Sequence, residues 1–185
     1  TLRNYQSRWA WAQISHPAQK KIKADWTRNP PLPARPAVMS STNKPVLRID
    51  WATHEAAKFA CVNWHYSECM PAGKIIKIGA WEDARFIGAV LFSRGANNRL
   101  GSPYKLEQTE ICELTRIALT KHTAPVSKIA AIAIRFLMRN SPGLRLLVSY
   151  ADPEQGHHGG IYQAGGWVYV GSSQAQREVI HNGKI

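Results

Sequence analysis

The chain has 185 residues, with 24 lysines and arginines against 12 aspartates and glutamates, a formal net charge of +12. This length predicts one domain, with or without an appended arm, and an apolar content of 44% excludes a wholly disordered chain. No run of about 18 apolar residues occurs, so we expect no membrane span. The first residues also lack the apolar stretch of a signal peptide.

The cysteine content indicates the cellular compartment, and the charge indicates the kind of binding partner. The cysteines, Cys61, Cys69 and Cys112, are odd in number and lack CxxC spacing, so a disulfide framework and a zinc ribbon are not expected. A reducing compartment, the cytoplasm, fits this pattern best. The positive charge predicts an acidic partner, and nucleic acid is the simplest one.

Basic charge and proline are concentrated in the first 50 residues. This stretch holds nine lysines and arginines against two aspartates, a local charge of +7, and six of the eleven prolines. Consecutive prolines favour extended chain, so residues 29–45 are expected to be a linker or a strap on the surface. We therefore divide the chain into a basic arm and linker (1–45), a main folded domain (46–173) and a C-terminal tail (174–185).

Tryptophans and lysines are interleaved ahead of this linker, and we expect a short helix there. The residues concerned are Trp9, Trp11, Trp26, Lys20, Lys21 and Lys23. Such a mixture suits contact with nucleic acid through base stacking and phosphate neutralisation. An equally good interpretation is that the tryptophans only fix the arm to the domain.

From residue 46 the pattern is that of a mixed α/β domain. Residues 46–49 form a short strand, and Thr53 caps a helix that runs to about His65. Residues 75–81 and 86–92 are two β-rich runs joined by a hairpin turn at 82–85, and residues 94–104 are a loop.

The second half continues the alternation of strands and helices. A strand at 110–119 precedes an amphipathic helix that begins near Pro125 and stops at 140–143. Residues 144–150 are a nearly continuous apolar strand, hence central in the sheet, followed by a short helix at 161–164 and a strand at 167–170. The order predicts an α/β (α+β) fold, with a mixed central sheet flanked by helices.

Polar side chains gather where the strand 144–150 ends. They are Ser149, Tyr150, Asp152, Glu154, His157, His158 and Tyr162. Ligands in open α/β sheets bind beyond the carboxyl ends of strands, so this is a candidate site. The alternative is an ordinary glycine-rich turn, in which Asp152 caps the next helix and the histidines are exposed.

A second cluster, His65 and Tyr66, ends the first predicted helix. If the fold brings it to the first cluster, His65, Asp152 and His158 would form a two-histidine, one-carboxylate set, which suits a divalent metal such as non-haem iron. A histidine that is merely packed or caps the helix is the alternative interpretation.

Two charged residues, Glu113 and Arg116, lie within the predicted strand 110–119. Strand alternation places Glu113 on the face of Ile117 and Arg116 on the face of Leu114. A buried charge needs a partner or a ligand, so each is either a member of the site or one half of an ion pair with another strand.

Four stretches together resemble the Mom family of phage DNA-modification proteins. They are SYADPEQGHHGGIYQAGGWVYVG (149–171), VNWHYSECMPAGK (62–74), FSRGANN (92–98) and CELTRIAL (112–119). The resemblance covers most of residues 46–173. The family looks like a divergent branch of the GNAT acetyltransferases, since residues 161–167 are similar to a Tyr-x-x-x-Gly-Phe turn of that superfamily.

A GNAT-like fold implies acetyl-CoA or another CoA-type donor, bound near Ser127, Lys128 and Tyr162. The sequence departs from the superfamily here, because residues 121–128 lack the glycines that usually cradle the CoA pyrophosphate. A helix N-terminus at this place still offers free N–H groups to a phosphate.

The resemblance implies conversion of adenine in DNA to N6-(carbamoylmethyl)adenine, which shields phage DNA from restriction in the bacterial host. The new group is attached through its CH2, so simple acetyl transfer is not the whole mechanism, and a redox-capable metal could help. The implied roles are proton transfer or metal orientation for Asp152 and Tyr66, donor contact for Tyr162, and pocket shape for Glu113 and Arg116.

The implied partner is double-stranded DNA with its target adenine flipped out of the helix. The basic side chains expected on DNA are Lys20, Lys21, Lys23, Arg28 and Arg94. Two rival functions remain: a CoA-dependent N-acetyltransferase acting on a protein or small amine, and a non-enzymatic DNA-binding module on a GNAT scaffold. The oligomeric state is open, a homodimer being one option.

Overall fold

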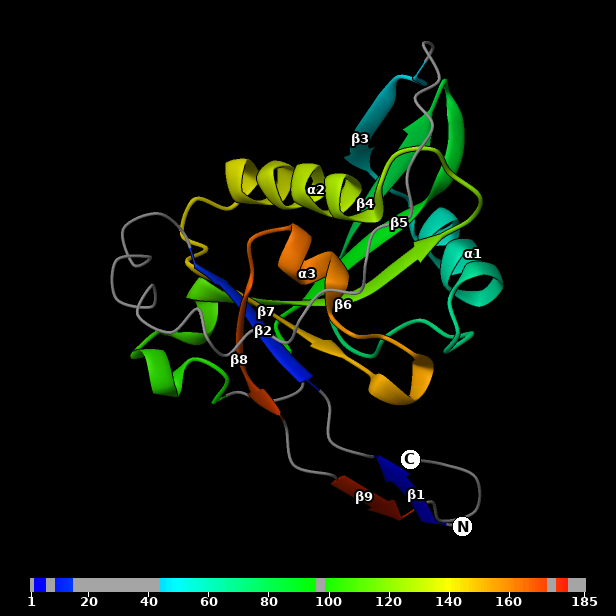
Figure 1. Ribbon diagram of the computed structural model, residues 1–185. Coiled ribbons are helices and arrows are strands. Elements are labelled where there is room, and N and C mark those ends of the chain that lie inside the picture. Colours follow the sequence, from blue (N-terminus) through cyan, green and yellow to red (C-terminus); the bar gives the residue numbers. More distant parts are fainter. Residues whose placement is uncertain (1, 6–8, 15–43, 96–98, 173–175, 180–185) are drawn as a thin grey trace.

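The computed structural model describes residues 2–5, 9–14, 44–95, 99–172 and 176–179 (Figure 1). The expected linker up to residue 43, and with it Trp26 and the four arm residues predicted to contact DNA, lies outside the described residues. Those four are Lys20, Lys21, Lys23 and Arg28.

One mixed sheet organises the described part of the chain. Its strands are β2 (Trp9–Ile14), β3 (Leu47–Trp51), β4 (Ile75–Glu82), β5 (Arg85–Ser93), β6 (Ile111–Leu119), β7 (Leu146–Ala151) and β8 (Val168–Ser172). The spatial order is β3-β4-β5-β6-β7-β2-β8. Only the β6–β7 pair is parallel, and the other neighbours are antiparallel. The predicted α+β class with a mixed central sheet is confirmed.

Helices cover both faces of this sheet (Figure 1). They are α1 (His54–Trp64), α2 (Val126–Asn140) and α3 (Gly160–Ala164), with short 3₁₀ helices η3 (Ser102–Tyr104), η4 (Gln108–Glu110) and η5 (Pro153–Gln155). The larger core cluster joins α2 and α3 to one face, and a smaller one joins α1 to the other. Thr53 caps α1 as predicted, because its Oγ accepts the N–H of Ala56 at 3.2 Å.

The segment Trp9–Ile14 is a strand, so the prediction of a short helix is wrong there. Tryptophan and alanine alternate in this segment, and a period of two suits a strand. Strand β2 pairs with β7 on one side and β8 on the other, and Trp11 is fully buried. Trp11 is therefore part of the core and is not free to stack on a nucleic-acid base.

A second, two-stranded sheet was not predicted. Strand β1 (Leu2–Tyr5) pairs antiparallel with β9 (Gln176–Val179), which lies in the stretch expected to be a tail. Figure 1 shows this pair as a separate small sheet, in which the first described strand lies beside the last.

Strand β6 contains a β-bulge at Thr115. Leu91 of β5 lies opposite Arg116, whereas the next residue, Phe92, lies opposite Leu114, so Thr115 is the extra residue. The Thr115 hydroxyl donates to the carbonyl of Leu91 at 3.0 Å, which anchors the bulge.

The bulge shifts the alternation of side chains along β6. Leu114 and Ile117 both pack into the core beneath α2, whereas Ala118 packs beneath α1. Because alternation holds on each side of the bulge, Glu113 and Arg116 lie on the same face, that of Ala118. The prediction that the two charges occupy opposite faces is wrong, because it assumed an unbroken strand.

The parallel strands β6 and β7 pair over only part of their length. Their ladder runs from Ile111 opposite Leu146 to Leu114 opposite Ser149. Beyond this point β6 continues to Leu119 with β5 as its partner, and β7 continues with β2. The sheet is therefore split after Leu114 and Ser149. None of the helices in the described part of the chain is long and apolar enough to cross a membrane.

Candidate functional site

A pocket of about 580 Å³ opens at the split between β6 and β7. Its walls are the second half of β6, the residues that follow α1, the residues before α2, and the turn that leads into α3. The volume lies within the ~300–1,000 Å³ typical of small-molecule sites. The split in the sheet is therefore the candidate site.

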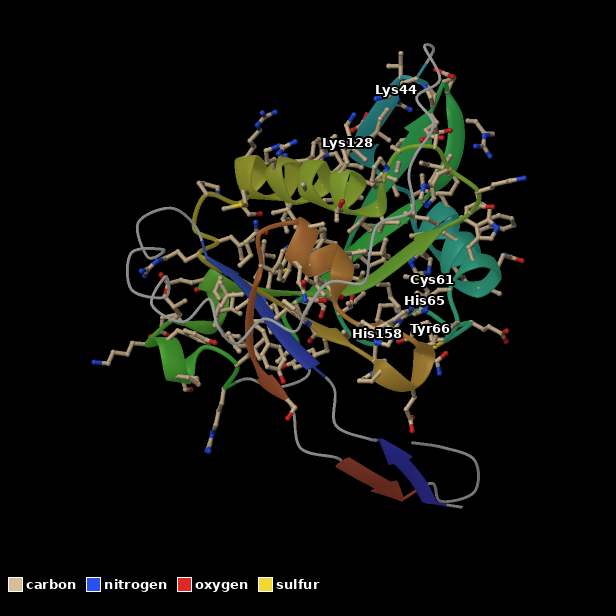
Figure 2. All side chains as sticks on the ribbon, viewed as in Figure 1. Lys44, Cys61, His65, Tyr66, Lys128 and His158 are labelled. Atoms are coloured by element: carbon tan, nitrogen blue, oxygen red, sulfur yellow. The ribbon has the colours of Figure 1, made fainter. Side chains whose placement is uncertain are left out.

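Several residues predicted from separate stretches of sequence meet in this pocket. Tyr66, Arg116 and Tyr162, expected to be catalytic, all line it, and so do His65 and His158. Figure 2 shows His65, Tyr66 and His158 at the same end of the molecule, below α1. The prediction that the two clusters come together has support in this geometry.

Asp152 is absent from the pocket wall. Its Oδ1 accepts the N–H of Glu154 at 3.2 Å and caps the short helix η5. This is the alternative interpretation of the turn, in which Asp152 has a structural role.

Of the residues expected to hold a cofactor, Tyr162 lines the pocket but Ser127 and Lys128 do not, and neither does Arg94, the one described residue expected to contact DNA. Ser127 borders a separate slot of about 10 Å³. Lys128 is exposed on α2, as Figure 2 shows, and Arg94 is exposed after β5. The partly buried Glu113 points toward the turn at Gly95, where an added Cβ would lie 3.1 Å from its Oε2.

The hydroxyl of Tyr162 has a fixed orientation in the pocket wall. Ser149, which is buried, donates its only proton to the carbonyl of Leu114 at 2.8 Å. The 2.8 Å contact between the hydroxyls of Ser149 and Tyr162 is then a bond that Tyr162 donates. Burial raises the pKa of Tyr162, so the phenol is neutral. Its lone pairs are the part of the hydroxyl left to accept a bond from a ligand.

Trp11 and Gly159 support Tyr162 from behind. The rings of Trp11 and Tyr162 stack with centroids 5.8 Å apart. Gly159 has a φ of +71°, and a Cβ added there would lie 2.3 Å from the Trp11 ring. Glycine is required at this position both for the backbone conformation and for the close approach of the indole.

His65 is a neutral ring of defined tautomer. Its Nδ1 accepts the backbone N–H of Ser67 at 3.1 Å, so Nδ1 carries no proton and Nε2 carries the single proton of the neutral ring. Burial, aided by the positive charge of Arg116 and by the neighbouring His157, lowers the pKa of His65 to about 4. At neutral pH the Nε2–H group of His65 is therefore a hydrogen-bond donor.

These features do not fit the predicted metal site. No three histidine, cysteine or acidic side chains in the described ranges are grouped in a way that could hold a metal ion. Nδ1 of His65 accepts the N–H of Ser67, and Oδ1 of Asp152 accepts the N–H of Glu154, so each group already has a partner in its own turn. The arrangement of His65, Asp152 and His158 in the structure therefore does not fit a metal ion.

The loop before α2 already holds a carboxylate. Glu82, only 3% exposed, accepts the N–H of Thr123 at 2.9 and 3.0 Å and the N–H of Ala124 at 2.7 Å. These amides lie in the segment where a GNAT protein would cradle a CoA pyrophosphate. Because Glu82 occupies them, the loop does not fit a diphosphate at this place.

The buried cysteines are not nucleophiles. Burial raises the pKa of both thiols, that of Cys112 to about 12. Cys112 donates to the carbonyl of Ser93 at 3.0 Å. Both side chains remain protonated thiols near neutral pH.

Sequence reasoning assigned no role in the site to Trp11 or Glu82. The alternation in Trp9–Ile14 was a usable signal for a buried strand beside the site. No sequence signal pointed to Glu82, because it is one residue of a predicted hairpin turn and lies 41 residues from Thr123.

Fold and pocket together define an α+β protein with a preformed small-molecule site in a split central sheet. The chain belongs to the Mom protein family, whose model matches residues 46–185. This family is associated with phage DNA modification. The search of curated proteins found no match. Strand β2 precedes the matched stretch, although it lies inside the sheet.

Proposed function

We propose that this chain is an enzyme that converts adenine in DNA to N6-(carbamoylmethyl)adenine and so protects phage DNA from restriction. Support comes from its membership of the Mom family and from the pocket in the split sheet. Its place of action is then the cytoplasm of the bacterial host, where phage DNA is modified. The relation to GNAT acetyltransferases remains part of this proposal.

The observation that carries the proposal is the orientation of the Tyr162 hydroxyl. The exocyclic N6 amino group of adenine is a hydrogen-bond donor. Because Tyr162 donates its hydroxyl hydrogen bond to Ser149, the lone pairs of the Tyr162 oxygen are free to accept a hydrogen bond from such an amino group. Tyr162 then holds N6 with a lone pair directed toward the donor molecule.

The mouth of the pocket suits a base that has been flipped out of the duplex. Tyr66 is 47% exposed, and its ring lies 4.2 Å from that of His65 and 5.4 Å from that of His157, measured between centroids. Aromatic rings of this kind can stack on a flipped base. The net charge of +12 supplies attraction to the flanking phosphates.

The transfer balances as a substitution at carbon. The bond between N6 and the CH2 group forms, the bond between CH2 and its leaving group breaks, and N6 loses one proton, which leaves with the departing group or passes to water. The leaving group takes the electron pair of the broken bond, so no net oxidation or reduction occurs. The donor is therefore a carbamoylmethyl group attached to a leaving group.

A conventional CoA-dependent acetyltransferase is less well supported. Glu82 already accepts hydrogen bonds from the backbone amides that would bind a pyrophosphate. Acetyl transfer would also join N6 to a carbonyl carbon, and not to a CH2 group. A purely DNA-binding module gives no reason for a hydroxyl fixed as an acceptor in the wall of this pocket.

Mass spectrometry of nucleosides tests the proposal. DNA from cells that express the full chain is digested, and deoxyadenosine bearing a carbamoylmethyl group is the expected product. Unmodified deoxyadenosine alone, from cells with intact, folded protein, would overturn the proposed reaction.

A further inference from the structure

Arg116 is a positive charge in the wall of the pocket. It follows the bulge at Thr115, which turns its side chain to the face of the sheet that α1 covers. The side chain is partly buried and lines the pocket together with His65. Its charge contributes to the low pKa of His65, so the two groups are close enough to interact.

The guanidinium of Arg116 is incompletely paired. One NH2 group donates to the carbonyl of Thr115 at 3.0 Å. The Nε–H group is buried and has no hydrogen-bond partner. The ion pairs found among the described residues do not include Arg116. A buried donor left without a partner is costly, and the cost is greater on a charged group.

No acidic side chain lines the pocket. Its wall contains tyrosine, histidine, aliphatic and glycine residues, with Arg116 as the one lysine or arginine among the described lining residues. The nearby Tyr150 and Tyr162 are neutral, because burial and also the negative charge of Glu113, which lies outside the lining, raise the pKa of each phenol. The Nε2–H group of His65 adds a donor of hydrogen bonds. The lining of the pocket thus carries one positive charge, that of Arg116, and a hydrogen-bond donor beside it.

We propose that Arg116 binds an oxyanion in this pocket, and that the small-molecule donor carries a carboxylate or phosphate group placed against it. The inference that this oxyanion belongs to the donor rests on the proposed function; the binding site itself does not. Arg116 then binds the anionic group of the donor, and Tyr162 binds the amino group of the base.

The chemistry of arginine favours this occupant. Its planar fork matches the oxygens of a carboxylate or a phosphate, and such charge-assisted bonds are stronger than neutral ones. The Nε atom itself is buried, so an oxyanion in the pocket meets the NH2 groups of that fork and neutralises the charge of the whole guanidinium. If the oxyanion is the leaving group of the transfer, Arg116 also stabilises the charge that develops on it.

Side-chain NMR of the full chain without DNA tests the proposal. The Nε–H signals of ¹⁵N-labelled arginines are followed during titration with acetate, inorganic phosphate or neutral acetamide at constant ionic strength. The signal of Arg116 is identified by its loss in Arg116→Lys. We expect it to shift saturably with acetate or phosphate and not with acetamide. The stronger of the two responses tells a carboxylate from a phosphate.

Two variants give the matched comparison. In Arg116→Gln the arginine signal is lost, so binding is followed through the ring signals of His65, which lines the same pocket. This variant should bind the effective probe about tenfold or more weakly, as expected for loss of a charge-assisted bond. Arg135→Gln, which removes an exposed arginine on α2 away from the pocket, should leave that binding unchanged. If Arg116→Gln does not fold, the titration of the unchanged protein decides alone.

The outcomes separate this inference from the proposed function. An Arg116 signal that ignores both oxyanions, or that responds equally to acetamide, overturns the oxyanion site even if DNA is modified. A saturable oxyanion response in a protein that leaves DNA unmodified upholds the site and counts against the proposed reaction.

Discussion

The hydroxyl of Ser149 lies 2.8 Å from the hydroxyl of Tyr162 and accepts a hydrogen bond from it. Ser149 itself donates to the carbonyl of Leu114 at 2.8 Å, at the last paired position of β6 and β7. A hydrogen-bond chain therefore runs from the pocket into the point where the sheet splits. It fixes the direction in which Tyr162 meets a ligand.

Ser149→Ala breaks this chain and frees the Tyr162 proton. We expect the yield of modified adenine to fall about tenfold or more, because the hydroxyl is no longer fixed as an acceptor, and stability to fall by about 1–3 kcal/mol. Ser149→Thr, which keeps the hydroxyl, is the control for loss of the bond. Nucleoside analysis and urea unfolding measure the two effects. Full modification by Ser149→Ala would show that the orientation of Tyr162 does not matter.

Gly159→Ala tests the support behind Tyr162. Its Cβ would lie 2.3 Å from the Trp11 ring, whereas a Cβ at Gly156 meets nothing within 4 Å, although φ is similar at +71° and +69°. Gly156→Ala should therefore cost about 1 kcal/mol for backbone strain, and Gly159→Ala a further ~1–3 kcal/mol for overpacking. Equal unfolding free energies for the two variants would contradict the contact with Trp11.

Glu82→Gln tests the carboxylate in the loop before α2. Burial raises the pKa of Glu82, but hydrogen bonds from Ala124 and Thr123 and the nearby His122 outweigh it, and the net pKa is lowered. The stabilisation is therefore present above the ordinary pKa of about 4.5 and is lost as pH falls through the lower, folded-state value. We expect the variant to lose about 1.5–3 kcal/mol at pH 7.

Unfolding measured across pH distinguishes this effect from general damage. The difference in stability between the parent chain and Glu82→Gln should shrink as the medium becomes more acid than pH ~4.5. A difference that stays constant down to the acid end would mean that the charge of Glu82 is not what holds the loop.

His65 should titrate far below an ordinary histidine. Burial and the charge of Arg116 hold its pKa at about 4, against about 6.5 for a free ring. Because the unfolded chain takes up the proton first, this contribution to stability is intact above pH ~6.5 and declines as pH falls toward the folded value. Arg116→Gln should raise the pKa of His65. NMR titration of the His65 ring measures this pKa. An unchanged pKa in the variant would show that the charge of Arg116 does not act on His65.

Much of the fold was predictable because its signals are local. The cap at Thr53 and the amphipathic pattern of α2 gave those helices, and the hairpin of β4 and β5 was expected at its observed place. Strand β2 was missed because its alternation is short and is followed by the lysine-rich stretch, which was given more weight.

The site was only partly predictable, because its decisive features join distant residues. Tyr66, Arg116 and Tyr162 were named and do line the pocket. The bulge at Thr115, which sets the face of Arg116, depends on pairing with β5 and leaves no mark in sequence. Asp152 caps a turn in the structure, and an aspartate that caps a turn and one that serves a site look alike in sequence.

The central claim, that the pocket presents a fixed acceptor to the N6 amino group of adenine in DNA, has one direct test. DNA is isolated from cells expressing either the parent chain or Tyr162→Phe, at matched levels of folded protein, and its nucleosides are analysed by mass spectrometry. The account predicts N6-(carbamoylmethyl)deoxyadenosine with the parent chain and at least a ~tenfold lower yield with Tyr162→Phe. Equal yields from the two proteins, or no modified adenine from the parent chain, would contradict it.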